Sequence, residues 1–155
     1  MYSKLICDSL KQQFNSQTFV YKIERVKKAI IVEDFELIAD IWKNILEEIG
    51  FNEIEIIRHA DEVESKVLEI IPDIILMDIN LPGAKNGIEL TESLIKQNDS
   101  LKVMILTIHT DPSYVQNAIK VGAKGFMTKN SSISEIKKGI SEILSGKIYL
   151  CEEVR

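Results

Sequence analysis

Acidic and polar side chains follow short apolar runs of this sequence at the points where those runs end. Glu33, Asp34 and Asp78 each come directly after or one residue after such a run, Thr107 closes another, and Lys129 lies just past a fourth. Carboxylates that lie close together repel one another, which raises their pKa values unless a cation lies among them. These residue types therefore predict a site for a hard divalent cation with a lysine beside it.

The chemistry expected of such a site is phosphoryl transfer to a carboxylate. Mg²⁺ prefers octahedral oxygen coordination, keeps several waters and is usually held by one or two carboxylates. We expect Asp34 and Asp78 to bind Mg²⁺ directly and Glu33 to bind it through water. A carboxylate beside a metal can attack phosphorus and form an aspartyl phosphate. Mg²⁺ and Lys129 would then neutralise charge on the phosphoryl oxygens during in-line transfer.

The elements that must position these residues are predicted by two alternating patterns. From Ala29 onward, short runs rich in β-branched residues alternate with segments of helical apolar spacing, which indicates βα units around a parallel sheet. Ligands of such sheets bind beyond the carboxyl ends of the strands. The expected strands are Lys28–Val32, Glu53–Ile57, Ile74–Met77, Val103–Thr107 and Gly125–Met127. The expected helices are Phe35–Ile49, Ala60–Ile70, Gly87–Gln97, Pro112–Val121 and Ser132–Leu144.

Length and composition indicate one globular domain. The chain has 155 residues, of which 45% are hydrophobic and 28% charged, a balance typical of proteins with a packed core. Its longest apolar runs have four residues, whereas a membrane span needs about 20. Charged residues interrupt the first dozen positions, where a secretory signal would be apolar. We expect no membrane segment and a cytoplasmic location.

The domain boundaries follow from the same patterns. Residues 28–146 contain the βα units, residues 1–27 form an N-terminal extension without an assigned function, and residues 147–155 form a C-terminal tail or the start of a linker. In the extension, Ile6, Leu10 and Phe14 could line one face of a short helix, and Thr18–Ile23 could form a strand, although a partly ordered tail is the simpler interpretation.

Charge and cysteine content exclude other classes of function. The net charge is −5, and the residues after position 28 carry −9, which argues against sequence-independent binding of nucleic acid. Cys7 and Cys151 lie near opposite ends and are expected to be unpaired thiols. His59 and His109 are expected at the surface rather than as metal ligands.

Taken in order, these residues resemble the receiver domain of bacterial two-component response regulators, over about residues 28–146. The resemblance rests on Glu33-Asp34, on Asp78 within the segment DINLPG, on Thr107, and on Phe126 and Lys129 within GAKGFMTK. The interval of 44 positions from Asp34 to Asp78 and of 22 from Thr107 to Lys129 makes the combination specific. It implies a doubly wound, flavodoxin-like α/β fold with five parallel strands in the order 2-1-3-4-5.

The resemblance also implies roles for individual residues. Asp78 would accept a phosphoryl group from the phosphohistidine of a sensor histidine kinase or a phosphotransfer protein. Asn80 would lend Mg²⁺ its backbone carbonyl, and Thr107 would hydrogen-bond the phosphoryl oxygen. Phe126 would turn inward, which makes Thr107 and Phe126 the switch pair.

One departure from the family pattern lies between Asp78 and Gly87, where nine steps replace the usual eight. An extra loop residue is therefore expected within residues 84–86, at the rim of the pocket. The family varies at the place of His109, where side chains tune the loss of the phosphoryl group.

The output is left open by the sequence. The segments around Thr107 and Phe126, with the closing GKIYL, are similar to receivers that precede a LuxR-type DNA-binding domain. Only five residues follow Leu150, too few for such a domain, so this chain itself is not expected to bind nucleic acid. It would be either the receiver part of a transcription regulator or a stand-alone receiver that signals by docking, with a second copy of the chain as one candidate partner.

A phosphatase of the haloacid dehalogenase type is an alternative from another class. It also uses an aspartate nucleophile with Mg²⁺, but it needs a second aspartate two residues later, where this chain has Asn80. Apart from self-phosphorylation and autodephosphorylation at Asp78, no turnover of a separate substrate is expected.

Overall fold

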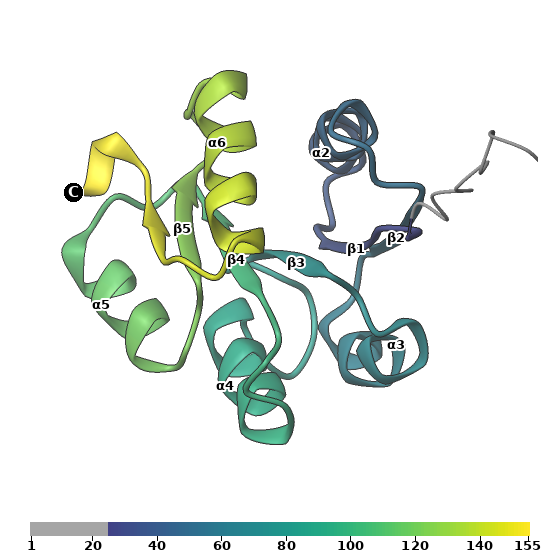
Figure 1. Ribbon diagram of the computed structural model, residues 1–155. Helices are drawn as coiled ribbons and strands as arrows, with labels where there is room; N and C mark the ends of the chain where they lie inside the picture. The colour runs from purple at the N-terminus through teal and green to yellow at the C-terminus, as the bar shows by residue number, and fades with distance from the viewer. Residues whose placement is uncertain (1–24) are drawn as a thin grey trace, which may run out of the picture.

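The computed structural model describes residues 25–155 as a parallel β-sheet with helices on both faces (Figure 1). The sheet runs in the order β2-β1-β3-β4-β5-β6. Its strands are β1 (Lys28–Val32), β2 (Glu53–Ile57), β3 (Ile74–Asp78), β4 (Val103–Thr107), β5 (Gly125–Thr128) and β6 (Tyr149–Leu150). The expected order 2-1-3-4-5 is confirmed, and β6 extends the sheet by one short strand.

Five helices and two short turns complete the described chain. They are α2 (Glu36–Glu48), η1 (Ala60–Glu62), α3 (Val63–Ile70), α4 (Gly87–Gln97), α5 (Pro112–Lys120), α6 (Ile133–Leu144) and η2 (Glu152–Val154). Each predicted helix is present within a few residues of its predicted bounds. The suggestions made above for Ile6, Leu10, Phe14, Thr18–Ile23 and Cys7 concern residues outside the described part of the chain.

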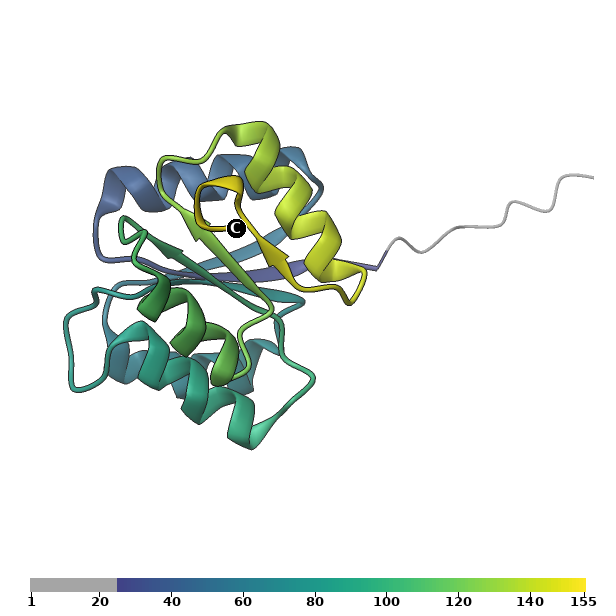
Figure 2. The ribbon, with the colours of Figure 1, turned by 90° about the vertical axis from the view of Figure 1, so that its left-hand side faces the viewer.

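Side chains at alternate positions of each strand enter two separate apolar cores, because successive residues of a strand point to opposite faces. Ile31, Leu76 and Met127 belong to the core beneath α2 and α6. Ile30, Met77 and Phe126 belong to the core beneath α3, α4 and α5. Figure 2 shows the two helical layers on either side of the sheet. This explains why the central strands read as continuous apolar runs rather than as alternating ones.

Three helices, α4, α5 and α6, begin where the sequence provides capping groups. The side chain of Asp111 accepts a hydrogen bond from the amide of Ser113 at 2.8 Å, and Pro112 occupies the first helical position. Asn86 and Glu89 form a capping box at the start of α4. These caps fix where the loops after β3 and β4 end, and those loops border the carboxyl edge of the sheet.

The sixth strand was not predicted from the sequence. Tyr149 and Leu150 pair in parallel with Gly125 and Phe126 of β5. A strand of two residues is too short to show an alternating pattern, so only its partner in the fold identifies it. Cys151 follows it and is fully buried, with no disulfide among the described residues.

Candidate functional site

The sheet brings the predicted site residues to one edge. Asp78 is the last residue of β3 and lies opposite Leu106, while Thr107 ends β4 and lies opposite Thr128 of β5. Glu33 directly follows β1, the other neighbour of β3. In parallel strands all these ends share one edge, which is therefore the edge that the sequence predicted.

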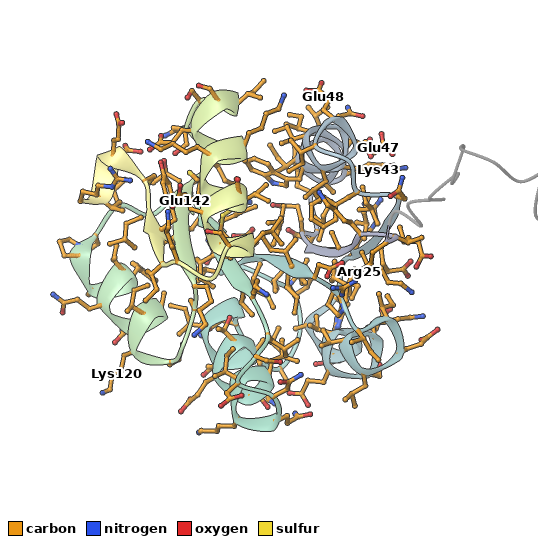
Figure 3. The ribbon with its side chains drawn as sticks, in the orientation of Figure 1. Arg25, Lys43, Glu47, Glu48, Lys120 and Glu142 are labelled. Carbon is orange, nitrogen blue, oxygen red and sulfur yellow. The ribbon has the colours of Figure 1, made fainter. Side chains whose placement is uncertain are left out.

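The opposite edge carries different chemistry. The residues labelled in Figure 3 include Glu48 at the end of α2, Lys120 at the end of α5 and Arg25 ahead of β1. They belong to the amino edge of the sheet, where helices end and strands begin. A groove of about 770 Å³ also lies at this edge. Arg25 and Lys137, which line this groove, form ion pairs with Asp73 at 2.7 Å and with Glu48 at 2.5 Å. The acidic site is therefore the stronger candidate for a functional site.

Three carboxylates form the centre of the candidate site. One ligand oxygen from each of Glu33, Asp34 and Asp78 lies within 4.8 Å of the other two. Glu33 and Asp78 are buried, with 2% and 5% of their surface exposed, whereas Asp34 is exposed. The cluster thus offers a metal ion two buried carboxylates and one carboxylate that is exposed to solvent.

A single ammonium group faces the two buried carboxylates. Nζ of Lys129 donates a hydrogen bond to Oδ2 of Asp78 at 2.8 Å and lies 2.6 Å from Oε2 of Glu33. The Lys129 side chain is itself largely buried, with 14% exposed. One positive charge therefore balances two negative charges in a region of reduced solvent, before Asp34 is counted.

The pKa values of two groups report this imbalance. Burial raises the pKa of Glu33, and the neighbouring charge of Asp78 adds to the rise, while Lys129 offsets part of it. For Lys129, burial alone would lower the pKa, but the hydrogen bonds and charges of Asp78 and Glu33 outweigh burial and raise it. The lysine is therefore firmly charged, and a further cation would favour the ionised form of Glu33.

The donor set fits a hard divalent cation. Oε2 of Glu33 is buried, and its close polar partner among the described residues is the ammonium group of Lys129 at 2.6 Å, which Asp78 also contacts. A buried carboxylate that shares its counter-charge with a second carboxylate gains from a further cation. Carboxylate oxygens of this kind, one of them accessible, are the ligands that Mg²⁺ takes in proteins.

The segment after β3 is turned toward the site by local hydrogen bonds. The amide of Asn80 donates to Oδ1 of Asp78 at 3.3 Å, and the amide of Gly87 donates to the carbonyl of Ile79 at 2.9 Å. A Cβ atom on Gly87 would lie 1.9 Å from the carbonyl oxygen of Asp78. Glycine is therefore required for α4 to begin this close to the end of β3.

The loop in which the sequence predicts an extra residue contacts the turn after β2. The amide of Ala84 donates to Oδ1 of Asp61 at 3.1 Å, and Nζ of Lys85 pairs with Glu64 at 2.7 Å. The amide of Ala60 donates to the carbonyl of Pro82 at 2.9 Å. These contacts hold the loop at the rim of the site, away from the carboxylates.

His109 takes part in a contact that the sequence did not predict. Its Nε2 lies 3.2 Å from Nδ2 of Asn80, and its ring stacks on that of Tyr114 with the centroids 4.4 Å apart. It thus bridges the loop after β3 and the helix α5 across the mouth of the site. Its place two residues after Thr107 was the only sequence signal for this position.

The two expected switch residues lie on adjacent strands. Thr107 is fully buried, and its Oγ1 accepts a hydrogen bond from the amide of His109 at 3.1 Å. Phe126 is fully buried in the core beneath α3, α4 and α5, opposite Ile105 of β4. The inward position of Phe126 is therefore the one present in this structure.

Comparison with known proteins matches this arrangement. The sequence model of the family described as response regulator receiver domain covers residues 29–141. The transcriptional regulatory protein DegU of Brevibacillus brevis is 33% identical over 129 residues, which cover 81% of this chain and 53% of DegU. The chain thus spans about half the length of the curated relatives it matches.

Two solved structures agree with the fold. A two-component response regulator of the LuxR family from Aurantimonas sp. SI85-9A1 superimposes with a TM-score of 0.78 at 25% identity, covering 83% of this chain and 92% of its own. A CheY-like receiver domain protein from Methanospirillum hungatei JF-1 gives a TM-score of 0.72 at 29% identity, covering 78% and 95%. The chain therefore belongs to the response regulator receiver domain family.

Proposed function

We propose that this receiver domain, at residues 28–146, accepts a phosphoryl group on Asp78. The observation that carries the proposal is the triangle formed by Asp78, Glu33 and Lys129 at the carboxyl edge of the sheet, with Asp34 within reach. Lys129 faces two carboxylates and Asp34 adds a third, so the cluster has an excess of negative charge that favours a second cation. A phosphoryl group could then bind to both cations.

In this proposal Asp78 acts as the nucleophile. A carboxylate oxygen of Asp78 forms a bond to phosphorus while the bond from phosphorus to the imidazole nitrogen of the donor breaks, and that nitrogen keeps the electron pair. The product is an acyl phosphate. Lys129, hydrogen-bonded to Asp78 at 2.8 Å, neutralises charge on the transferred oxygens.

Mg²⁺ would be held by Asp34, Asp78 and the backbone carbonyl of Asn80, with Glu33 acting through water. When bound, it supplies positive charge that stabilises the phosphoryl oxygens in the transition state. The chain's own contribution is to orient these ligands, since the backbone amide of Asn80 donates a hydrogen bond to the carboxylate of Asp78. The Asn80–His109 contact connects the loops that follow β3 and β4 beside the site.

Thr107 and Phe126 are proposed as the switch. Oγ1 of Thr107 already accepts the His109 amide, so its hydroxyl proton is available for a phosphoryl oxygen. Movement of this hydroxyl shifts the balance between two arrangements of the segment that joins β4 to α5.

Exposed apolar side chains surround this edge and fit a protein phosphodonor. Phe35, Ile108 and Ile133 follow or approach the ends of β1, β4 and β5, and 61%, 64% and 56% of their surfaces are exposed. Receiver domains of this family are phosphorylated by histidine kinases. A kinase or a phosphotransfer protein that presents its phosphohistidine on an apolar helical surface would cover these residues and exclude water from Asp78. The proposal places the chain in the cytoplasm with such a donor; none of the described helices is long and apolar enough to cross a bilayer.

The proposed output is control of transcription, as the name of DegU states for that protein. A stand-alone receiver that signals by docking to a partner, including a second copy of this chain, is the alternative. A haloacid dehalogenase type phosphatase is disfavoured because Asn80, which occupies the place of its general acid, contacts His109 through its side-chain amide.

A small donor with a phosphorus–nitrogen bond tests the proposed chemistry without the cognate kinase. Phosphoramidate and Mg²⁺ should add about 80 Da, one phosphoryl group, to the intact protein. Replacing Mg²⁺ by EDTA should abolish the gain. A mass that does not change under either condition would contradict the proposal.

A further inference from the structure

The last residues of the chain, 149–155, form a segment that lies against β5 and that we call the C-terminal strap. Beyond the pairing of β6 with β5, the amide of Cys151 donates to the carbonyl of Phe126 at 3.0 Å. Cys151 is fully buried. In Figure 2 this yellow segment runs beside the green strand β5. The strap therefore lies beside the strand that contains Phe126 and that ends immediately before Lys129.

A partly buried side-chain hydrogen bond joins the strap to the end of β5. Oγ1 of Thr128 donates to Oε2 of Glu153 at 2.6 Å and lies 3.2 Å from Oγ of Ser131. Thr128 is fully buried, while Glu153 lies at the surface. Thr128 is the residue immediately before Lys129, so this bond acts on the backbone from which the site ammonium extends.

Further contacts hold the strap as one unit. The amide of Glu152 donates to Oε1 of Glu135 on α6 at 2.7 Å, and Nε of Arg155 donates to the carbonyl of Leu150 at 2.7 Å. The guanidinium group of Arg155 also lies over the Tyr149 ring, 5.0 Å from its centroid. A displacement at Glu153 is therefore transmitted to the pairing of β6 rather than absorbed by one side chain.

We propose that Thr128 and Glu153 are positioning residues for Lys129, and that they couple the strap to the Asp78 site. The inference rests on the proposed function, because it names a regulation of that same site. Lys129 is fixed at one end by Asp78 and at its own amide by the carbonyl of Thr107 at 2.8 Å. A phosphoryl group on Asp78 draws the ammonium toward its oxygens, and the backbone at Thr128 must follow.

Coupling of this kind is reciprocal. If the state of Asp78 changes the stability of the strap, then a change in the strap alters reactions at Asp78 by the same free energy when the two are at equilibrium. A partner that binds or displaces residues 149–155 would thereby regulate the retention of the phosphoryl group. This predicts effects in both directions, and each can be measured separately.

The first measurement is the phosphorylation of variants of Thr128 and of the strap. Thr128→Val removes the hydroxyl and keeps the shape, and Glu153→Ala removes the acceptor. Both should change the rate of phosphoryl gain from phosphoramidate and Mg²⁺ about fivefold, the lower end of typical coupling energies. Thr128→Ser keeps the donor and should behave as the parent protein. Glu152→Ala is the matched control, since the Glu152 carboxylate forms no hydrogen bond or ion pair among residues 25–155.

The second measurement is amide hydrogen exchange of the strap. Asp78→Asn removes one of the two negative charges that Lys129 contacts. It should change the exchange rate of the Cys151 amide about fivefold. The amide of Gly50 donates a hydrogen bond to the carbonyl of Glu47 at the opposite edge of the sheet. Its exchange rate reports any global change in stability and should stay constant. In a Thr128→Val background the effect of Asp78→Asn on Cys151 should disappear.

The outcomes separate the two proposals. If the parent protein gains a phosphoryl group and both Thr128→Val and Glu153→Ala gain it at the parent rate, the coupling is wrong and the proposed function stands. If the parent protein gains none, the proposed function is wrong, and the exchange of Cys151 still decides the coupling. Equal exchange of Cys151 in the parent and in Asp78→Asn overturns it.

Discussion

The ammonium group of Lys129 lies 2.8 Å from Oδ2 of Asp78, although 51 positions separate the two residues in the sequence. The same ammonium lies 2.6 Å from Oε2 of Glu33. Lys129 thus joins the ends of three strands, β1, β3 and β5, through a hydrogen bond to Asp78 and an ion pair with Glu33. The pocket keeps an excess of negative charge, and the following predictions depend on that excess.

Asp34→Asn should weaken Mg²⁺ binding at least about tenfold, equivalent to about 1.4 kcal/mol. Asp34 is the exposed carboxylate of the cluster, so its loss removes a ligand without disturbing the core. Calorimetric titration of the parent and the variant measures the difference. Asp40→Asn, on the exposed face of α2, is the control and should bind as the parent does. Equal affinities for the parent and Asp34→Asn would remove Asp34 from the site.

Glu33→Gln should be more stable than the parent at neutral pH in the absence of Mg²⁺. Burial raises the pKa of Glu33, so between its usual value of 4.5 and the raised value the folded protein binds a proton that the unfolded chain has lost. The free energy of unfolding of the parent therefore falls as the pH rises through this interval. Glutamine carries no such proton and lacks this decline.

Urea unfolding of the parent and Glu33→Gln from pH 4.5 upward, in EDTA, measures this difference. The raised pKa of Lys129 lies above 10.5 and does not contribute in this range. The sign of the result is decisive: a parent that gains stability relative to Glu33→Gln with rising pH would show that Glu33 is stabilised as an anion.

Thr107→Ala should accept the phosphoryl group but respond to it poorly. The variant lacks the hydroxyl donor, and one lost hydrogen bond of roughly 1–2 kcal/mol shifts a two-state balance about tenfold. Amide NMR shifts with and without beryllofluoride, a mimic of the phosphoryl group, measure the response. The changes at Phe126 and Tyr114 should shrink in Thr107→Ala and persist in Thr107→Ser. Undiminished changes in Thr107→Ala would assign the coupling to another residue.

Gly87→Ala should destabilise the protein by about 2–3 kcal/mol, because its Cβ would meet the carbonyl oxygen of Asp78. Gly50→Ala is the comparison. Gly50 has a φ of +90° but no atom within 4 Å of an added Cβ. Gly50→Ala should therefore lower the free energy of unfolding by only about 1 kcal/mol, through backbone strain alone. Thermal or urea unfolding ranks the two. A smaller loss for Gly87→Ala than for Gly50→Ala would contradict the close approach of α4 to β3.

Much of the fold could be predicted because its signals are local. The apolar run that contains Leu76 marks a strand buried on both faces, and Asp111-Pro112 marks the start of a helix. The edge at which Asp78 and Lys129 meet follows from these elements once the sheet is known to be parallel.

The features that were missed depend on contacts between distant segments. The strand at Tyr149 exists only because β5 offers it a free edge. The bond from Thr128 to Glu153 and the stacking of His109 on Tyr114 depend on side-chain positions that no periodicity encodes. The pairing of Lys85 with Glu64 likewise appears only when the loop after β3 lies against α3.

The most direct test of the account is the intact mass of the parent protein and of Asp78→Asn after incubation with acetyl phosphate and Mg²⁺. Asparagine keeps the shape of the side chain but lacks the anionic nucleophile. The parent should gain about 80 Da and Asp78→Asn should gain nothing. If Asp78→Asn gained the phosphoryl group as readily as the parent, Asp78 could not be the phosphoacceptor.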